Sequence, residues 1–292
     1  MTTSDYKKNF AIFILSHGRA NEILTVNTLQ RQHYTGDYYI VIDNEDDQED
    51  IYRKKFGDKV IQFDKKAEAD KTDTGDLDND RRVGVFARNA IQDIADKMGY
   101  KYHLQLDDDF SCFTIRFKNG EKLGSSIVKD LDFLFKSVLE FFESTNIDAL
   151  SFSLPADFMG GVESPKLKAG LYPKTMGTFF MKREKKRYFK MRMNDDITTC
   201  LLNNRVGNLF LTIAQIMVDT PGTQDMVGGM TDIYVENGTY RKSFYSVMNC
   251  PSFVKIYAFR NRTGTRLHHQ VEWDYANPKI LSEKYKKWNM II

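Results

Sequence analysis

The sequence predicts an α/β fold with a mostly parallel, twisted sheet flanked by helices. Short apolar segments alternate with segments of helical periodicity, which is the pattern of strands joined by crossover helices. Three of the predicted strands end in polar residues, at 16–19, 43–46 and 107–109. In sheets of this class the ligand binds beyond the carboxyl ends of the strands. The convergence of the three polar segments at that edge is the first sign of a functional site.

The first part of the chain contains four predicted strands and two predicted helices. Each strand is a short apolar run, and each helix repeats its apolar residues every three or four positions. The second helix should stop at Gly99, because glycine readily adopts the left-handed conformation that ends a helix. The polar stretch 66–80 is expected to be a mobile loop. The strands are expected at 9–16, 37–45, 59–65 and 100–109, and the helices at 21–32 and 85–99.

The second part of the chain continues the alternation of strands and helices. We see no internal repeat and no linker that forces a second domain, so one domain is expected over 1–292, with halves at 9–110 and 111–292. The segment 156–176 contains Gly and Pro and is expected to be a loop. The helices are expected at 130–145 and 194–208, and the strands at 148–155, 177–183 and 209–219.

The composition is that of a soluble, folded protein. Hydrophobic residues make up 41% and charged residues 28% of the 292 residues, and the net charge is only +2. No apolar run approaches the roughly 18–20 residues of a membrane-spanning helix. The first residues lack the apolar core of a signal peptide, and three widely spaced cysteines indicate a reducing compartment. We therefore expect a cytoplasmic protein without a membrane partner; the sequence leaves its oligomeric state open.

The segment YHLQLDDDF places Asp107, Asp108 and Asp109 directly after a predicted strand. Adjacent carboxylates repel one another unless water screens them or a cation lies between them. Asp107 and Asp109 form a D-x-D motif that can converge on one divalent ion, Mn²⁺ or Mg²⁺. A hard cation held by few protein oxygens keeps positions open for substrate phosphates. Aspartate clusters also cap turns, but this one closes an apolar strand at the expected ligand edge, which favours a metal site.

Four segments resemble, in order, the motifs of nucleotide-sugar glycosyltransferases of the GT-A fold. They cover residues 9–208. The last one departs from the family pattern, because Asn194 to Asp196 replace the usual acidic pair, and this leaves the assignment of the base open. The segments are FAIFILSHGRAN, YIVIDNEDD, GVFARNAIQDIADKMGYKYHLQLDDDF and YFKMRMNDDITTCLLNNRVGN.

The resemblance implies a nucleoside-diphosphate sugar as donor, with UDP expected, bound by the half 9–110. It assigns Asp43 to the nucleoside and Arg88 to the donor phosphates or sugar, and Asp108 to the ribose or sugar. Members of this group commonly recruit a late histidine as a third metal ligand. His268 and His269 are the only late histidines, and we favour His268. Donor contacts are also expected in the first loop, from Ser16, His17, Gly18 and Arg19.

The acceptor hydroxyl needs a proton acceptor on the face of the sugar opposite the leaving group. Asp196, in the first turn of the predicted helix 194–208, is our candidate for this base, and Asp195 is the alternative. The resemblance places the general base of inverting members at this position. Both aspartates are also favoured there by the helix dipole alone, which would make them simple helix-terminus residues.

A run of basic residues at 182–192 would suit a polyanionic acceptor. The segments MTDIYVENGTYRKSFYSVMNCPSF and KIYAFRNRTGTRLHHQVEWDYANPKIL resemble the phage-type, TET-associated glycosyltransferases, which implies a hydroxymethylated pyrimidine of DNA as acceptor and the host cytoplasm as location. The target base would then leave the helix and could stack on Tyr or Phe side chains between 234 and 259. The candidate nucleic-acid contacts are Lys182, Arg183, Lys185, Lys186, Arg187 and Arg262.

Other classes remain open at this point. A glycosyltransferase with a saccharide or small-molecule acceptor needs the same metal site but no DNA-binding surface. A nucleotidyltransferase also uses two aspartates and a metal on an α/β sheet, but it would normally have a Gly-rich phosphate loop after the first strand, and SHGRAN has one Gly only. A non-catalytic binding module would not need the D-x-D motif.

Overall fold

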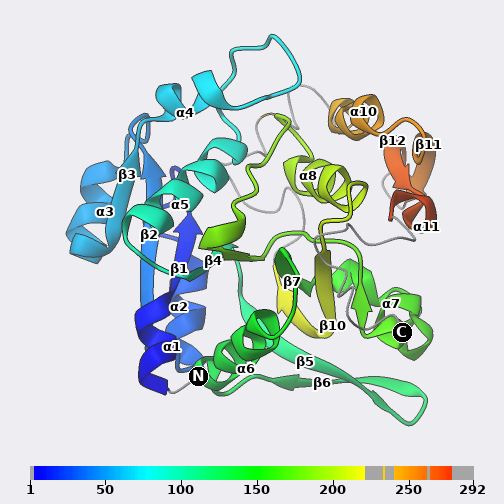
Figure 1. The fold of residues 1–292 in the computed structure, drawn as a ribbon, viewed down its shortest axis with the longest axis horizontal. Helices are drawn as coiled ribbons and strands as arrows, with labels where there is room; N and C mark the ends of the chain where they lie inside the picture. Colours follow the sequence, from blue (N-terminus) through cyan, green and yellow to red (C-terminus); the bar gives the residue numbers. More distant parts are fainter. Residues whose placement is uncertain (1–2, 221–232, 234–239, 262–263, 278–292) are drawn as a thin grey trace, which may run out of the picture.

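The computed structural model describes residues 3–220, 233, 240–261 and 264–277, and it is organised around one large mixed sheet flanked by helices (Figure 1). The strand order is β3-β2-β1-β4-β9-β7-β10-β5-β6, with β8 paired to β10 beside this path. The strands are β1 (Phe10–Leu15), β2 (Asp37–Asp43), β3 (Val60–Phe63), β4 (Tyr102–Asp107), β5 (Cys112–Asn119), β6 (Lys122–Ile127), β7 (Ala149–Ser153), β8 (Leu171–Tyr172), β9 (Phe179–Lys182) and β10 (Phe210–Asp219).

Most strands of this sheet run in the same direction. β3, β2, β1 and β4 are parallel neighbours, and so are β7 and β10. β9 is antiparallel to both β4 and β7, so these two strands point the same way on either side of it. The carboxyl ends of β1, β2, β4, β7 and β10 therefore lie at one edge of the sheet. The predicted α/β class with a mostly parallel sheet is confirmed.

The helices cover both faces of the sheet. On β1, Ala11 and Phe13 face a cluster that includes Ile91 of α5, whereas Phe10 and Ile12 face the cluster formed with α2 and α6. Burial on both faces explains why the parallel strands are nearly continuous apolar runs. The helices are α1 (Thr3–Asn9), α2 (Leu24–Arg31), α3 (Glu49–Phe56), α4 (Lys65–Lys71), α5 (Val85–Lys97), α6 (Leu131–Glu143), α7 (Pro165–Ala169), α8 (Asp195–Asn204), α10 (Tyr240–Asn249) and α11 (Trp273–Ala276).

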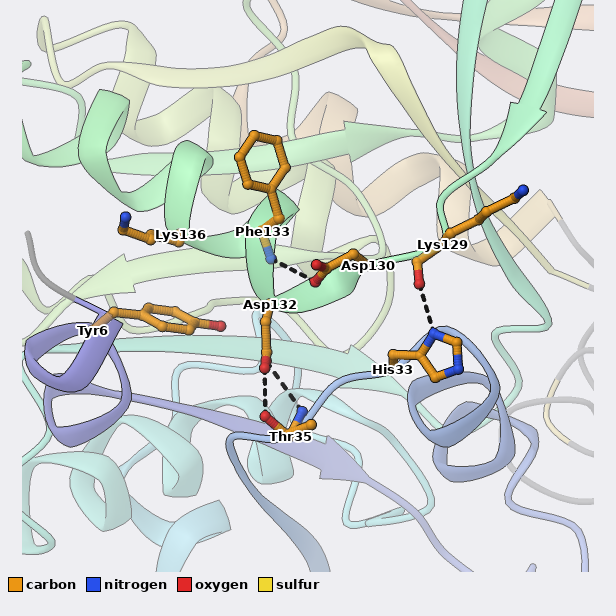
Figure 2. Close-up of a pocket in the computed structure, with 8 residues that line it drawn as sticks. All are labelled: Tyr6, His33, Thr35, Lys129, Asp130, Asp132, Phe133 and Lys136. Carbon is orange, nitrogen blue, oxygen red and sulfur yellow. Dashed lines mark hydrogen bonds between the residues drawn. The ribbon is translucent and has the colours of Figure 1, made fainter.

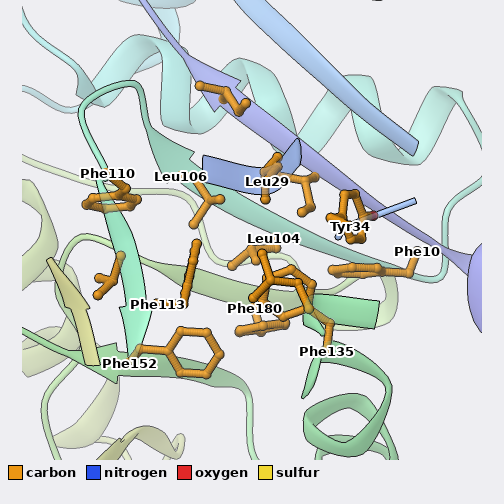
Figure 3. Close-up of a cluster of buried hydrophobic side chains, with 14 of the residues drawn as sticks. Phe10, Leu29, Tyr34, Leu104, Leu106, Phe110, Phe113, Phe135, Phe152 and Phe180 are labelled. Atoms are coloured by element: carbon orange, nitrogen blue, oxygen red, sulfur yellow. The ribbon is translucent and has the colours of Figure 1, made fainter. Parts of the chain in front are cut away.

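Aromatic side chains fill the larger of these clusters (Figure 3). The rings of Phe152 and Phe180 are 5.2 Å apart, and those of Phe113 and Phe135 are 5.7 Å apart at nearly a right angle. Offset and edge-to-face pairs of this kind add to the stabilisation from buried area. Four of these phenylalanines come from β5, β7, β9 and α6, so the cluster fixes the central strands of the sheet relative to one another.

Several segments differ from what the sequence predicts. The expected loop 66–80 begins with α4, whose first turn is capped by Asp64 through the backbone N–H of Ala67. The expected loop 156–176 contains α7 and β8. A β5–β6 hairpin, the helix α3 and a separate two-stranded sheet, β11 (Val254–Asn261) with β12 (Gly264–Val271), were not predicted. In contrast, α5 ends at Lys97 with Gly99 at a φ of 84°, as predicted.

In the part of the chain that is described, no helix has both the length and the apolar character required to cross a membrane.

Candidate functional site

The ends of β1 and β4 are joined through Asp108. Its Oδ2 accepts a hydrogen bond from Ser16 Oγ at 2.6 Å, and its Oδ1 accepts one from Arg19 Nη1 at 2.8 Å. The side chain is buried, which raises its pKa, while the positive charge of Arg19 acts in the opposite direction. Asp108 therefore fixes the first loop, and both of its oxygens are engaged by that loop rather than turned toward a ligand.

The backbone of the aspartate segment is held by the start of α2. Thr25 Oγ1 donates to the carbonyl of Asp107 at 2.6 Å and accepts from the N–H of Phe110 at 3.0 Å. The first loop itself turns at Gly18, whose φ is 67°, a conformation that glycine adopts without strain. The N–H of Gly18 donates to Asp46 Oδ2 at 2.9 Å, which links this loop to the end of β2.

Asp43, at the end of β2, is surrounded by two basic side chains. His17 Nδ1 lies 2.9 Å and Lys65 Nζ 3.1 Å from its Oδ2. Burial alone would raise the pKa of Asp43, but the contacts with His17 and Lys65 hold it below its usual value. The same hydrogen bond raises the pKa of His17, whose side chain remains 41% exposed. Sequence reasoning did not select Lys65, although it follows the third strand at the expected ligand edge.

Arg88 of α5 connects the two halves of the site. Its Nη2 donates to Asp107 Oδ1 at 2.9 Å, and its Nε lies 3.2 Å from Asp195 Oδ2 at the start of α8. The guanidinium also lies over the ring of Phe179, 5.0 Å from the centroid. One buried cation thus faces two carboxylates. Burial raises the pKa of Asp195 to about 7, since the neighbouring Asp196 and Asp107 add to this effect and Arg88 opposes it.

The two aspartates of α8 have different surroundings. Asp195 is buried and turned toward Arg88. Asp196 is more exposed, and its Oδ1 accepts the N–H of Ile197 at 2.7 Å in the first turn of the helix. The preceding residue, Asn194, has a φ of 54°, which asparagine tolerates better than most residues. Because Asp195 and Asp196 are consecutive residues of a helix, their side chains leave it in different directions.

Asp109 carries the strongest signal for a cation. Burial and, after it, the negative charges of Asp107 and Asp108 together raise its pKa to about 7. Carboxylate oxygens that repel one another in this way match the hard ligands that Mg²⁺ and Mn²⁺ prefer. The residues present therefore fit a divalent ion. Within the described residues, however, no three His, Cys, Asp or Glu side chains form a cluster that could hold a metal, so His268 is not assembled with the aspartates.

The two late histidines have opposite hydrogen-bond roles. His269 Nδ1 lies 3.1 Å from Asn194 Nδ2, and this amide nitrogen also donates to the carbonyl of Lys242 at 2.9 Å. His269 therefore accepts at Nδ1 and carries its proton on Nε2. His268 Nδ1 lies 2.7 Å from the carbonyl of His269, so its proton is on Nδ1. A contact from β12 to the residue that precedes α8 could not be predicted from sequence.

The first part of the basic run, residues 182–187, lies away from this site. Lys182 pairs in register with Tyr102, the first residue of β4, so the run begins at the edge of the sheet opposite Asp107. Its cations contact backbone carbonyls and carboxylates there: Arg187 contacts Asp148 at 2.7 Å and Lys186 contacts Asp96 at 2.7 Å. The other contacts are Lys182 with the carbonyl of Thr145, Arg183 with that of Gly99 and Lys185 with that of Asn146. Arg262 lies outside the described residues.

A cavity of about 550 Å³ lies elsewhere, between α1, the end of α2 and the start of α6 (Figure 2). Its lining includes Tyr6, His33 and Phe133, and Asp132 accepts a hydrogen bond from the N–H of Thr35 across it. Thr35 precedes β2, so the cavity is at the end of the strand opposite Asp43. It does not contain any of the predicted site residues.

The family comparison identifies the class of protein to which this site belongs: the chain is a glycosyltransferase. It belongs to the TET-associated glycosyltransferase family, whose model matches residues 10–229. Donors of this enzyme class are nucleotide sugars. A comparison with curated protein sequences found no match.

Solved structures are similar in fold at low identity. A mycobacterial protein is 9% identical with a TM-score of 0.50, over 93% of this chain and 88% of that one. The glucosyl-3-phosphoglycerate synthase of M. tuberculosis is 11% identical with a TM-score of 0.48, over 95% and 97% of the two chains. GalNAc-T7, in a structure with UDP, GalNAc and Mn²⁺, is 11% identical with a TM-score of 0.43, over 82% of this chain and 50% of that one.

Proposed function

We propose that this glycosyltransferase moves a sugar from a nucleoside diphosphate, with UDP expected, to the hydroxyl group of a 5-hydroxymethylpyrimidine in DNA, with the help of a divalent metal. The observation that carries the proposal is the Arg88 bridge, which joins Asp107 at the end of β4 to Asp195 at the start of α8. It brings together the two segments that would handle the donor and the acceptor. The DNA acceptor is supported by the family and by the resemblance of the C-terminal segments.

The donor would lie along the edge formed by β1, β2 and β4. Asp43 with Lys65 and His17 is the polar group nearest the end of β2, and we assign it to the nucleoside. Arg88 supplies a fixed positive charge next to Asp107. Such a charge is most effective where negative charge develops on the departing diphosphate, because the site is already organised before the reaction.

Asp107 and Asp109 would hold the metal, and His268, which is not assembled with them among the described residues, is the candidate for a third ligand. A bound Mn²⁺ or Mg²⁺ supplies positive charge to the diphosphate oxygens. A metal-binding histidine usually donates its other ring N–H to a carbonyl. His268 does so to the carbonyl of His269, which leaves Nε2 as its acceptor nitrogen. His269 has the opposite proton position, which is why we keep His268 as the candidate.

Asp196 would take the proton of the acceptor hydroxyl. The acceptor oxygen forms a bond to the anomeric carbon, the bond from that carbon to the diphosphate oxygen breaks, and the hydroxyl proton passes to the carboxylate. This is an inverting displacement. Asp195 is the weaker candidate for the base, because its carboxylate is buried against Arg88.

Release of nucleoside diphosphate from UDP-sugars tests the proposal. The assay compares Mn²⁺ with chelator, and duplex DNA containing 5-hydroxymethylcytosine with the same unmodified duplex. Release that requires both metal and modified DNA, and that is lost in Asp109→Ala and Asp196→Asn, would support the full proposal. Release at the same rate with and without DNA would indicate that the acceptor is a glycan or a small molecule. Failure to bind any nucleoside diphosphate would refute the site.

A further inference from the structure

Two lysines converge on one buried carboxylate at the catalytic edge of the sheet. Asp157 lies in a short 3-10 helix, Pro155–Phe158, directly after β7, and its side chain is 3% exposed. Its Oδ1 accepts from Lys166 Nζ and, at 2.8 Å, from Lys174 Nζ. Its Oδ2 accepts from the N–H of Leu154 at 2.9 Å. No step of the proposed reaction uses this group.

The cluster lies on the acceptor side of the reaction centre. β7 is parallel to β4, so Asp157 follows the same edge of the sheet as Asp107. Burial raises the pKa of the Cys200 thiol of α8 to about 12, and the charges of Asp196 and Lys174 both reach this thiol with opposite effects. Burial likewise lowers the pKa of His269 to about 4, with smaller contributions from neighbouring charges that include Lys174. Lys174 is also held at β10, the strand parallel to β7, because its carbonyl accepts a hydrogen bond from Thr212 Oγ1.

The cluster has an excess positive charge. One lysine would neutralise Asp157, whose pKa is held at about 2, because the two lysines and the N–H of Leu154 outweigh the effect of burial. The second lysine gives a net charge of +1. Burial lowers the pKa of Lys166, and the neighbouring charge of Lys174 lowers it further. Like charges held together in this way are unfavourable unless an anion joins them.

The exposure of the side chains fits an anion that comes from outside. The side chain of Lys166 is 35% exposed and that of Lys174 14%, whereas Asp157 is covered. An ammonium has three N–H donors, and the two lysines share a single acceptor atom of Asp157, Oδ1. The remaining donors of the two lysines can be shared by a single phosphate. The carboxylate beneath them restricts the side chains, so less entropy is lost when an anion binds.

We propose that Lys166 and Lys174 bind a phosphate group of the acceptor, and that Asp157 positions both side chains for it. The inference rests on the proposed function, because a DNA strand supplies a phosphate on each side of the nucleotide whose hydroxymethyl group reacts. A free nucleotide acceptor would offer the same chemistry through its single phosphate. The basic run 182–187 is unsuited to this task, since its cations are engaged at the opposite edge of the sheet.

The test is the salt dependence of DNA binding. Lys166→Gln and Lys174→Gln each remove one positive charge and keep a polar side chain, and Lys174→Arg keeps the charge. Lys168→Gln is the matched control, because Lys168 lies on the same short helix as Lys166 but contacts the exposed Glu163. Dissociation constants for duplex DNA with 5-hydroxymethylcytosine are measured by fluorescence anisotropy between about 50 and 200 mM salt. Thermal unfolding shows that each variant is folded.

Loss of one phosphate contact should reduce the slope of log K against log salt by about 0.9. The loss of affinity over a fourfold rise in salt should then be about 3.5 times smaller in each Gln variant than in the wild type. Lys168→Gln and Lys174→Arg should keep the wild-type slope. Unchanged slopes in folded Lys166→Gln and Lys174→Gln, together with an unchanged KM for a phosphorylated nucleotide acceptor, would overturn the inference and leave the proposed function standing. A wild type that neither binds nor modifies this DNA would overturn the DNA acceptor and the inference together.

The source of the phosphate is separated with a second acceptor. Transfer to the 5′-monophosphate of 5-hydroxymethyldeoxycytidine is compared with transfer to its unphosphorylated nucleoside. A rise in KM for the monophosphate alone in the two Gln variants, with the DNA slope unchanged, would assign the site to a free nucleotide. A reduced salt slope on DNA in the Gln variants, with the wild-type slope retained in Lys174→Arg, would assign the site to a phosphate of the DNA strand.

Discussion

The Arg88→Gln substitution tests the bridge between β4 and α8. The guanidinium contacts Asp107 at 2.9 Å and Asp195 at 3.2 Å, and its side chain is 10% exposed. Removing one member of a buried ion pair costs about 3–5 kcal/mol, because the remaining charge is left without its partner. Burial already raises the pKa values of both carboxylates, that of Asp195 to about 7, so both can take up protons. The loss should therefore be smaller at pH 6 than at pH 8.

Urea denaturation at the two pH values measures this loss, and steady-state transfer measures the activity of the folded variant. Removing a positive group aimed at developing charge typically lowers kcat by about 10²–10³-fold. Arg187→Gln is the matched control. Arg187 contacts the fully buried carboxylate of Asp148 at 2.7 Å, but it does so at the opposite edge of the sheet. It should lose stability and retain kcat.

Retention of wild-type kcat by folded Arg88→Gln would refute the reasoning, since the bridge would then be a structural feature only. Equal loss of kcat in Arg88→Gln and Arg187→Gln would refute it as well. In that case the effect would follow from stability and not from the place of the charge.

Two further predictions concern the start of α8. Asp195→Asn should flatten the pH dependence of stability. The folded pKa of about 7 lies above the unfolded value, so wild-type stability should fall as the pH rises from about 4 to 7, by up to about 1.4 kcal/mol per pH unit. If urea denaturation shows the same dependence of stability on pH in Asp195→Asn as in the wild type, this prediction is wrong. Asn194→Ala should be about 1–2 kcal/mol less stable than Asn194→Gly, because both lose the contacts with His269 and Lys242 but only alanine is strained at a φ of 54°. Equal stabilities in thermal unfolding would show that backbone strain is not significant here.

The local pattern of the sequence was sufficient to predict most of the fold. Apolar runs and helical periodicity gave the position of β1, β2, β4, α5 and α8 to within a few residues, because each of these elements is buried along a face set by its own repeat. The loop 72–82 could not be predicted in this way. It is ordered by Arg192 contacting Asp76 at 2.9 Å and by Arg241 contacting Asp78 at 2.8 Å, and these pairs are more than 100 residues apart in the chain.

The sequence was sufficient to predict at which strand ends the site lies, but not which side chains contact one another there. The topology alone brings Ser16, Asp43 and Asp107 to one edge, and the sequence indicates that edge. The number of basic residues in the run was a poor guide to DNA binding. The sequence does not show which carboxylate each basic side chain contacts after folding. Arg187 and Asp148 show this, since they are 39 residues apart and form an ion pair whose carboxylate is fully buried. Lys65 and Lys174 were missed because their carboxylate partners, Asp43 and Asp157, meet them only after folding.

The three adjacent aspartates have three different environments, and this division is itself testable. Asp107 contacts Arg88, Asp108 contacts Ser16 and Arg19, and the pKa of Asp109 is raised to about 7 by burial and by its two neighbours. Because its folded pKa lies above its unfolded value, ionised Asp109 lowers stability at pH 8. Asp109→Asn should therefore make the metal-free protein more stable at pH 8 and little different at pH 5.

The same variant should bind Mn²⁺ more weakly, because it removes one of the proposed ligands. Asp108→Asn should have the opposite effects. It should lower stability, because it weakens a buried acceptor for Ser16 and Arg19. It should leave Mn²⁺ binding unchanged, because the ligand oxygens of Asp107 and Asp109 stay in place. Denaturation at both pH values and Mn²⁺ titration separate the two variants. If Asp109→Asn is destabilised at pH 8, or binds Mn²⁺ as tightly as the wild type, the repulsion that motivates the metal site does not exist. A residue that lowers stability in the metal-free protein and raises it in the metal-bound protein is expected at a binding site, because ligand binding is what offsets its cost.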